Sequence, residues 1–267
     1  MRPDPERVAA IIAETVEADM LPHYLKLGAG AVRTKESPTD LVTIVDEAME
    51  AALKSRLLDL TPGAAFVGEE GAAADPALAK AISRAERCWI VDPLDGTRNF
   101  VNGVNEFGTI VAFVENGVTT GAWIYAAPLR AMAIGSKGEG VTWRGAPVRV
   151  RPPEGEKPAG YRSTGWLTPE WRDRLVSSLK KNVASEPGHC AAYAYLKLIE
   201  GAVDFKLSSR VHAWDHAAGA LMLQELGGDL RWLDTSKAYA PQESQDRPIL
   251  ATAPGRDWPA IASLLCN

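Results

Sequence analysis

Two acids three positions apart, Asp92 and Asp95, are the residues of this chain best suited to do chemistry. They follow an apolar run at residues 89–91, which is typical of a buried strand. Pro93 has no backbone donor for a sheet, so we expect the strand to stop there and both acids to lie on a turn. The Gly-Thr pair that follows favours a tight turn and the start of a helix. Both carboxylates are therefore expected to point into one cavity that suits a hard cation and a phosphate.

Three further acids lie at expected element boundaries, in or near loops rich in small residues: Asp46, Glu69 and Asp215. Carboxylate oxygens are ligands that Mg²⁺ prefers. Gathering four or five of them without a cation would raise their pKa values, at a cost of about 1.4 kcal/mol per pKa unit. Taken singly, Glu69 fits a solvated loop tip, and the other two fit acids in the first turn of a helix. Their occurrence together is what predicts a magnesium site.

A histidine pair around Asp215 raises the alternative of zinc. His212 and His216 stand four positions apart, the spacing of two ligands on one face of a helix. The run between them lacks the glutamate of an HExxH arrangement, and no third ligand is obvious. We therefore favour packing of His216 at a helix start over a zinc site.

Composition and charge narrow the class of protein. The chain has 267 residues, of which 46% are hydrophobic, enough for one large domain or two intimate ones. A net charge of -5 argues against a nucleic-acid partner. The three cysteines lack metal-ligand spacing, and Cys88, in the apolar run before Asp92, is expected to be a buried thiol in a reducing compartment. We find no signal peptide and no apolar stretch that could cross a membrane, so we expect a soluble, cytoplasmic protein.

The periodicity of apolar residues divides the chain into two halves. Within residues 1–150 the pattern favours three helices and an antiparallel sheet. The helices are expected at 4–26, at 43–58 and near 77–87. The strands are expected at 65–67, 88–91, 107–114, 118–125, 131–136 and 141–150. The strand at 65–67 is expected to deliver Glu69 into a loop. A Pro- and Gly-rich linker at 151–158 precedes an α/β half, residues 151–267. That half favours strands at 161–163, 203–207, 228–232 and 249–252 and helices at 169–181, 190–201, 214–226 and 257–265.

Four segments resemble, in order, the motifs of the inositol monophosphatase superfamily, the magnesium-dependent, lithium-sensitive sugar and inositol phosphatases. They are residues 37–46, 68–70, 89–100 and 214–219, and they extend over most of the chain. The resemblance implies an α/β (α+β) fold layered as an αβαβα sandwich, often found as a homodimer. It also implies hydrolysis of a small phosphate monoester with two or three Mg²⁺ ions per active site.

The resemblance further implies a role for each matching residue. Glu69, Asp92 and the carbonyl of Leu94 would hold the first Mg²⁺. Asp92, Asp95 and Asp215 would hold the second, with Asp92 bridging the two ions. An arrangement of paired metals can activate water and stabilise the departing oxygen, so no nucleophilic serine or cysteine is needed.

The catalytic roles follow from the same resemblance. Thr97, hydrogen-bonded to Asp46, would help Glu69 orient and deprotonate a water molecule. The backbone N–H groups of Gly96 and Thr97 would bind the phosphate beside Asp95. Lys35 and Asp40 belong to a matching loop region that completes a further metal site in the family.

The chain departs from the family pattern where the sugar is bound. Inositol-selective members carry an acid shortly before the Trp-Asp motif, whereas this chain has Ser208 there and adds Arg210. Arg98 is compatible with relatives that act on histidinol phosphate or sugar phosphates. Inositol 1-phosphate is therefore doubtful as substrate, and histidinol-phosphate, fructose-bisphosphate and nucleotide 3′-phosphatase activities are alternatives. A catalytically idle regulator that binds metal and phosphate is the alternative from another class.

Overall fold

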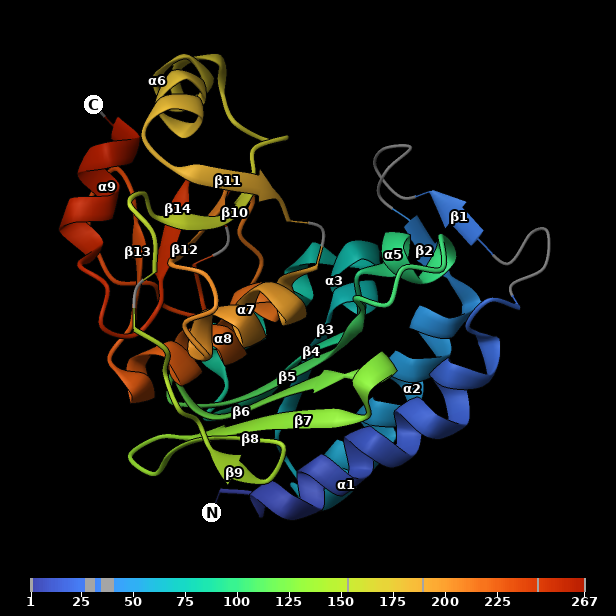
Figure 1. Cartoon of the computed structure of the whole chain (residues 1–267). Coiled ribbons are helices and arrows are strands. Elements are labelled where there is room, and N and C mark those ends of the chain that lie inside the picture. The colour runs from blue at the N-terminus through green and yellow to red at the C-terminus, as the bar shows by residue number, and fades with distance from the viewer. Residues whose placement is uncertain are drawn as a thin grey trace.

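The computed structural model describes residues 2–26, 32–34, 41–152, 154–188, 190–243 and 245–266. The chain folds into five layers, in which three pairs of helices enclose two sheets (Figure 1). This arrangement confirms the αβαβα sandwich that the sequence resemblance implied. Within the described residues, no helix combines the length and apolarity that a bilayer span requires.

Helices α1 and α2 form the first layer (Figure 1). The Asp4 side chain accepts a hydrogen bond from the Glu6 N–H and caps α1 (Pro5–Thr15). A π-helical turn (Val16–Met20) and a 3-10 turn (Leu21–His23) continue it, so the helix expected at 4–26 ends slightly early. A capping box begins α2 (Ile44–Leu60).

The second layer is a sheet of seven strands. Only the first pair is parallel, and the other pairs are antiparallel. Alternate side chains face opposite helix layers: Trp89 and Val91 pack toward α1 and α2, whereas Cys88 and Ile90 pack toward α7 and α8. In spatial order the strands are β3 (Ala65–Gly68), β4 (Arg87–Asp95), β5 (Gly108–Glu115), β6 (Val118–Ala126), β7 (Ala131–Ser136), β8 (Gly140–Trp143) and β9 (Ala146–Pro147).

The middle helices α7 (Ala191–Ile199) and α8 (Ala213–Leu226) separate this sheet from a second one (Figure 1). The outer helices α6 (Pro169–Lys181) and α9 (Trp258–Cys266) cover the far face of the second sheet. In spatial order its strands are β11 (Ala184–Pro187), β10 (Ala159–Ser163), β12 (Phe205–Ser208), β14 (Ile249–Thr252) and β13 (Asp229–Trp232).

Short elements lie around the first sheet: the antiparallel pair β1 (Val32–Thr34) and β2 (Leu41–Thr43), helices α3 (Glu69–Ala74), α4 (Ala81–Arg84) and α5 (Thr97–Val101), and 3-10 turns at Pro76–Lys80 and Ala127–Leu129. The helix expected at 77–87 is therefore split into a 3-10 turn and α4. The strand expected at 141–150 is in fact the hairpin β8–β9, because Arg144 and Gly145 adopt positive φ angles of 55° and 75°.

The segment Arg151–Pro158 connects the two sheets, since β9 ends before it and β10 begins at Ala159. The central core contains side chains from both sides of this segment, for example Ile110 and Ile249. Division of the chain into units 1–150 and 151–267 stays a prediction.

Candidate active site

A β-bulge brings Asp92 and Asp95 to the same face of the first sheet. Asp92 pairs with Ile110 and Asp95 with Gly108, so two residues of β4 oppose one residue of β5. In a regular strand, residues three apart point to opposite faces, and the extra residue cancels that alternation. The expectation that β4 stops at Pro93 is therefore wrong, because the strand continues to Asp95 through the bulge.

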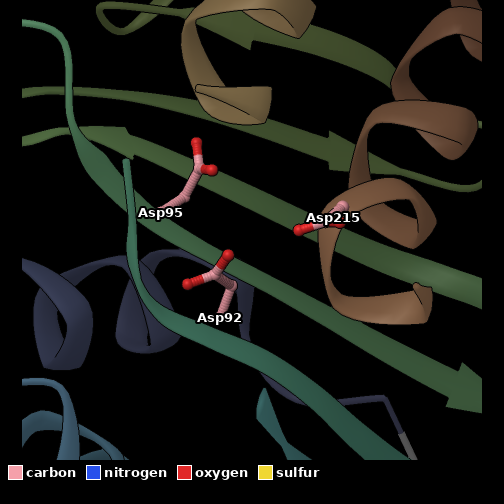
Figure 2. A group of neighbouring side chains, drawn as sticks. All are labelled: Asp92, Asp95 and Asp215. Atoms are coloured by element: carbon pink, nitrogen blue, oxygen red, sulfur yellow. The ribbon is translucent and has the colours of Figure 1, made fainter. Parts of the chain in front are cut away.

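Asp215, in the first turn of α8, joins the two acids of β4. Oxygens of Asp92, Asp95 and Asp215 lie within 4.8 Å of one another. Figure 2 shows the three carboxylates directed into a shared space between strand and helix. Asp92 is 2% exposed and Asp95 7% exposed, so the cluster lies mostly within the protein.

Glu69 lies beside this cluster and is the first residue of α3, not part of the loop that the sequence predicted. Its carboxyl group interacts with that of Asp92 through a hydrogen bond and through charge. Glu50, on α2, accepts hydrogen bonds from the N–H groups of Glu70 at 2.8 Å and Gly71 at 2.9 Å. Glu50 therefore caps α3 and fixes its first turn. A side chain at Gly68 would overlap Glu50, with a Cβ only 2.2 Å from its Oε2.

Sequence reasoning missed Glu50. It lies four residues after Asp46, on the same face of α2, and that spacing is the pattern that would have revealed it.

Asp46 and Thr97 meet as the resemblance implied. Thr97 Oγ1 lies 3.0 Å from Asp46 Oδ1 and 3.0 Å from the carbonyl oxygen of Leu94. The other oxygen of Asp46 accepts from the N–H and hydroxyl of Thr43 at 2.8 and 2.6 Å. The same carboxylate thus completes the capping box of α2 and holds the side chain that follows the β4 bulge.

Asp95 is held by the start of α7. Its carboxylate accepts hydrogen bonds from the N–H groups of Ala191 at 3.0 Å and Ala192 at 2.6 Å. The Cys190 thiol donates to Asp95 Oδ2 at 2.7 Å. Gly96, next in the chain, has a φ of 83°, and a Cβ there would lie 3.0 Å from the carbonyl oxygen of Glu106.

Burial and mutual repulsion disfavour the charged form of these acids. Burial, followed by the charges of Glu69 and Asp95, raises the pKa of Asp92 well above its usual value. Burial, Asp95 and Glu69 raise the pKa of Asp215 to about 8. Burial also raises the pKa of Asp46 to about 6. A cluster of hard oxygens whose charges oppose one another fits a divalent cation such as Mg²⁺, which would relieve that repulsion.

A cavity of about 300 Å³ opens beside the carboxylates, and its lining includes Asp95, Asp215, Ser208 and Arg210. Lys206 also lines it, a residue that sequence reasoning missed. Lys206 is 9% exposed and donates to Ser208 Oγ at 2.6 Å. Burial lowers its pKa to about 8, which still leaves it mostly protonated at neutral pH. The sequence signal for Lys206 was its place in β12 between two apolar residues, because alternation along a strand turns it to the face opposite to theirs.

The histidines take other partners. His216 is buried, and its Nδ1 lies 2.6 Å from the Tyr195 hydroxyl, which confirms the expected packing role. His212 stacks on Trp214. In the described part of the chain, the group of neighbouring side chains able to hold a metal contains aspartates and no histidine. Lys35 and Asp40 lie outside the described residues.

The sequence as a whole matches the inositol monophosphatase family over residues 6–266. The chain belongs to the inositol monophosphatase family. It is 31% identical over 245 residues to inositol-1-monophosphatase SuhB of Mycobacterium tuberculosis, covering 89% of this chain and 82% of that protein. It is 29% identical over 251 residues to inositol monophosphatase 1 of Rattus norvegicus, covering 91% and 88%. The chain is accordingly a phosphoric monoester hydrolase of this family.

Solved structures of family members share the fold. Thermotoga maritima IMPase superposes with a TM-score of 0.80 at 23% identity, covering 97% of this chain and 95% of that one. The SuhB protein of Bartonella henselae gives a TM-score of 0.82 at 20% identity, covering 97% of both chains. At these identities the likeness establishes the layered architecture of this inositol monophosphatase family member.

Proposed function

We propose that the chain hydrolyses a small phosphate monoester with Mg²⁺ as cofactor, by attack of water on phosphorus. The observation that carries this proposal is the convergence of the buried Asp92 and Asp95 with the half-buried Asp215. Glu69, Asp92 and the Leu94 carbonyl would hold one Mg²⁺, and the three aspartates would hold a second. Bound Mg²⁺ would lower the pKa of water and stabilise the departing oxygen.

The attacking water would be oriented by Glu69 and Thr97. Thr97 has a single hydroxyl proton, which either Asp46 Oδ1 or the Leu94 carbonyl could accept. If the Leu94 carbonyl binds a cation, the hydroxyl would donate to Asp46 Oδ1. Its oxygen then accepts a hydrogen bond from the water. Because the pKa of Asp46 is about 6, its carboxylate can take up a proton near neutral pH. The backbone N–H groups of Gly96 and Thr97, at the start of α5, would bind the phosphate.

A neutral inositol fits this chain less well than the family name suggests. Ser208 stands where inositol-selective members carry an acid, and the adjoining cavity holds Lys206 and Arg210. Histidinol phosphate, sugar phosphates and nucleotide 3′-phosphates are the alternative substrates within the same reaction class. We also propose a cytoplasmic homodimer, and the mass in solution tests its assembly.

Release of phosphate from p-nitrophenyl phosphate, with and without Mg²⁺, tests the proposal. We expect hydrolysis that EDTA abolishes and that excess Mg²⁺ restores. Calorimetric titration of Mg²⁺ into metal-free protein should show binding that Asp215→Asn weakens. Binding of Mg²⁺ without turnover of any ester would favour the idle regulator instead, and turnover that EDTA leaves intact would contradict the role of magnesium.

A further inference from the structure

The cavity beside the carboxylates is lined by more cationic side chains than the binding of a single phosphate group requires. Asp95 and Asp215 are the only acids among the described residues that line it. Four cationic side chains also line it: Arg98, Arg162, Lys206 and Arg210. The guanidinium of Arg162 donates to Ser185, and Arg98 follows Thr97, where the scissile phosphate is expected. Lys206 and Arg210 face the same cavity, and their charges favour the ionised form of Asp215.

The ammonium group of Lys206 lies inside the protein. Its neighbours Phe205 and Leu207 pack into the outer core, so alternation along β12 turns Lys206 toward the middle helices. Its Nζ donates to Ser208 Oγ and lies 5.2 Å from the centre of the Tyr195 ring. Burying a charge costs several kcal/mol unless an opposite charge compensates it. In this cavity, Asp95 and Asp215 are the sources of that compensation.

Occupation of those carboxylates by Mg²⁺ would remove the compensation. A neutral polyol in the cavity would then leave the Lys206 ammonium with hydroxyl and ring partners alone. An anionic group on the substrate would restore a partner of opposite charge. The electrostatics of Lys206 therefore favour an anion in the leaving group.

Arg210 is fixed in a way that suits the same task. Its guanidinium carbon lies 4.3 Å from the centre of the Trp166 ring, so the planar group stacks on an aromatic face. Stacking limits the conformations of the side chain and pre-organises its donors. Guanidinium donors match the oxygens of carboxylate and phosphate groups, which a neutral alcohol lacks.

We propose that the departing alcohol of the substrate itself carries a negative charge, a second phosphate or a carboxylate, which Lys206 and Arg210 bind. This inference rests on the proposed phosphatase function, because it concerns the leaving group of that reaction. Such a substrate would be released as an anionic alcohol and inorganic phosphate, with water supplying the hydroxyl and the proton.

Three phosphate monoesters of one three-carbon chain test the idea: one ends in a hydroxyl group, one in a carboxylate and one in a second phosphate. We expect kcat/KM for at least one anionic ester to exceed that of the hydroxyl ester about 10-fold or more, since hydrogen bonds to charged groups are the stronger ones. Which anionic ester is preferred distinguishes carboxylate from phosphate. Equal or better use of the hydroxyl ester would overturn the proposal.

Substitutions assign the preference to the two residues. Arg210→Gln and Lys206→Met should each lower the ratio of anionic to neutral kcat/KM by about 10-fold, the lower end expected for a charged hydrogen bond. Arg174→Gln is the matched control, because Arg174 also stacks on a tryptophan, Trp171, at 4.6 Å, but on the outer helix α6. It should keep the ratio of the unchanged protein. A ratio that Arg210→Gln leaves intact would overturn the assignment.

Binding provides a readout independent of turnover. Calorimetry with the Thr97→Ala protein in Mg²⁺ should show tighter binding of the anionic esters than of the hydroxyl ester. The difference should shrink when Arg210→Gln is added. A complete lack of hydrolysis together with this binding preference would defeat the proposed function and still support the present inference. Equal binding of all three esters would overturn the inference even if hydrolysis were observed.

Discussion

Asp95 accepts a hydrogen bond from the backbone N–H of Ala192 at 2.6 Å, which joins the end of β4 directly to the first turn of α7. The aspartate thus takes part in two structures at once, the carboxylate cluster and the amino terminus of a middle helix. A negative charge is stabilised there by the unsatisfied N–H groups of the helix. The position of this carboxylate is therefore fixed before any cation binds.

Asp95→Asn should abolish turnover while the protein stays folded. The amide removes one negative charge from the proposed cation site, and we expect kcat to fall at least about 10³-fold because metal stabilisation supplies several kcal/mol. The free energy of unfolding should change by no more than about 2 kcal/mol. Weakening the cap on α7 destabilises the fold, whereas weaker repulsion among the carboxylates stabilises it. Steady-state kinetics and chemical denaturation measure the two effects. Asp59→Asn, on the exposed side of α2, is the control, and full activity of Asp95→Asn would contradict the assignment.

Thr97→Ala should slow hydrolysis about 10²- to 10⁴-fold, the usual range for loss of a proton-transferring group. The hydroxyl that bonds Asp46 at 3.0 Å is lost, whereas the backbone N–H groups remain. Thr97→Ser restores the hydroxyl and should recover most of the rate. Comparison of kcat among the unchanged protein, Thr97→Ala and Thr97→Ser tests the role of the hydroxyl group. If serine fails to rescue, the methyl group and not the hydroxyl is what the site requires.

Glu50→Gln should lower kcat although Glu50 lies outside the carboxylate cluster. The N–H groups of Glu70 and Gly71 bind different oxygens of Glu50, and the amide replaces one of these oxygens by an NH2 donor, so α3 loses part of its cap and Glu69 is held less firmly. We expect a loss of stability of about 1–2 kcal/mol from the unsatisfied N–H group. Circular dichroism during denaturation and the Mg²⁺ dependence of kcat report these changes.

Glu47→Gln is the matched control for that experiment. Glu47 lies on the same helix, but it forms a surface ion pair with Arg33, which contributes at most about 1 kcal/mol. It should retain full activity. Equal losses in the two variants would show that general weakening of α2, and not the cap on α3, is responsible.

The metal-free protein should become less stable as the pH rises. The pKa of Asp215 is about 8 in the folded protein and about 3.9 in an unfolded chain, so the folded state holds an extra proton between those values. The free energy of unfolding should therefore fall by about 1.4 kcal/mol per pH unit from this group as pH rises toward 8. Denaturation in EDTA at several pH values measures the slope.

Mg²⁺ and Asp215→Asn should both flatten that slope. The cation favours the deprotonated carboxylates, and the amide cannot titrate. A slope that Asp215→Asn leaves unchanged would mean that other groups dominate the pH dependence.

Much of this structure could be predicted because apolar periodicity and turn chemistry are local properties. The strand Ile249–Thr252 and the helix Pro169–Lys181 were predicted with their observed bounds. Asn116 and Gly117, a dipeptide that favours a hairpin turn, join β5 to β6 with the positive φ angles that such a turn requires. The layered architecture, in contrast, came from the resemblance to a family, because stacking of layers depends on contacts that no local pattern records.

The errors arose where distant partners decide the outcome. Pro93 lacks a backbone donor and reads as a strand end, yet its carbonyl accepts a hydrogen bond from the Thr109 hydroxyl at 2.9 Å within the bulge. Glu69 reads as a loop residue because its cap, Glu50, lies on another helix. Strand β11 was missed because Ala184–Pro187 contains no apolar run and is extended only by pairing with β10.

The bulge in β4 makes the pocket depend on the irregular pairing of this strand as well as on residue type. Leu94 packs with Trp89 and Val91 in the apolar layer beside α1 and α2. Asp92 and Asp95 both point away from that layer because the bulge places one extra residue between them. If these same residues ran on as a regular strand, alternation would turn Asp95 into the hydrocarbon interior, with every aspartate still encoded. A change that let β4 pair regularly at this point would therefore inactivate the enzyme as surely as replacing an acid.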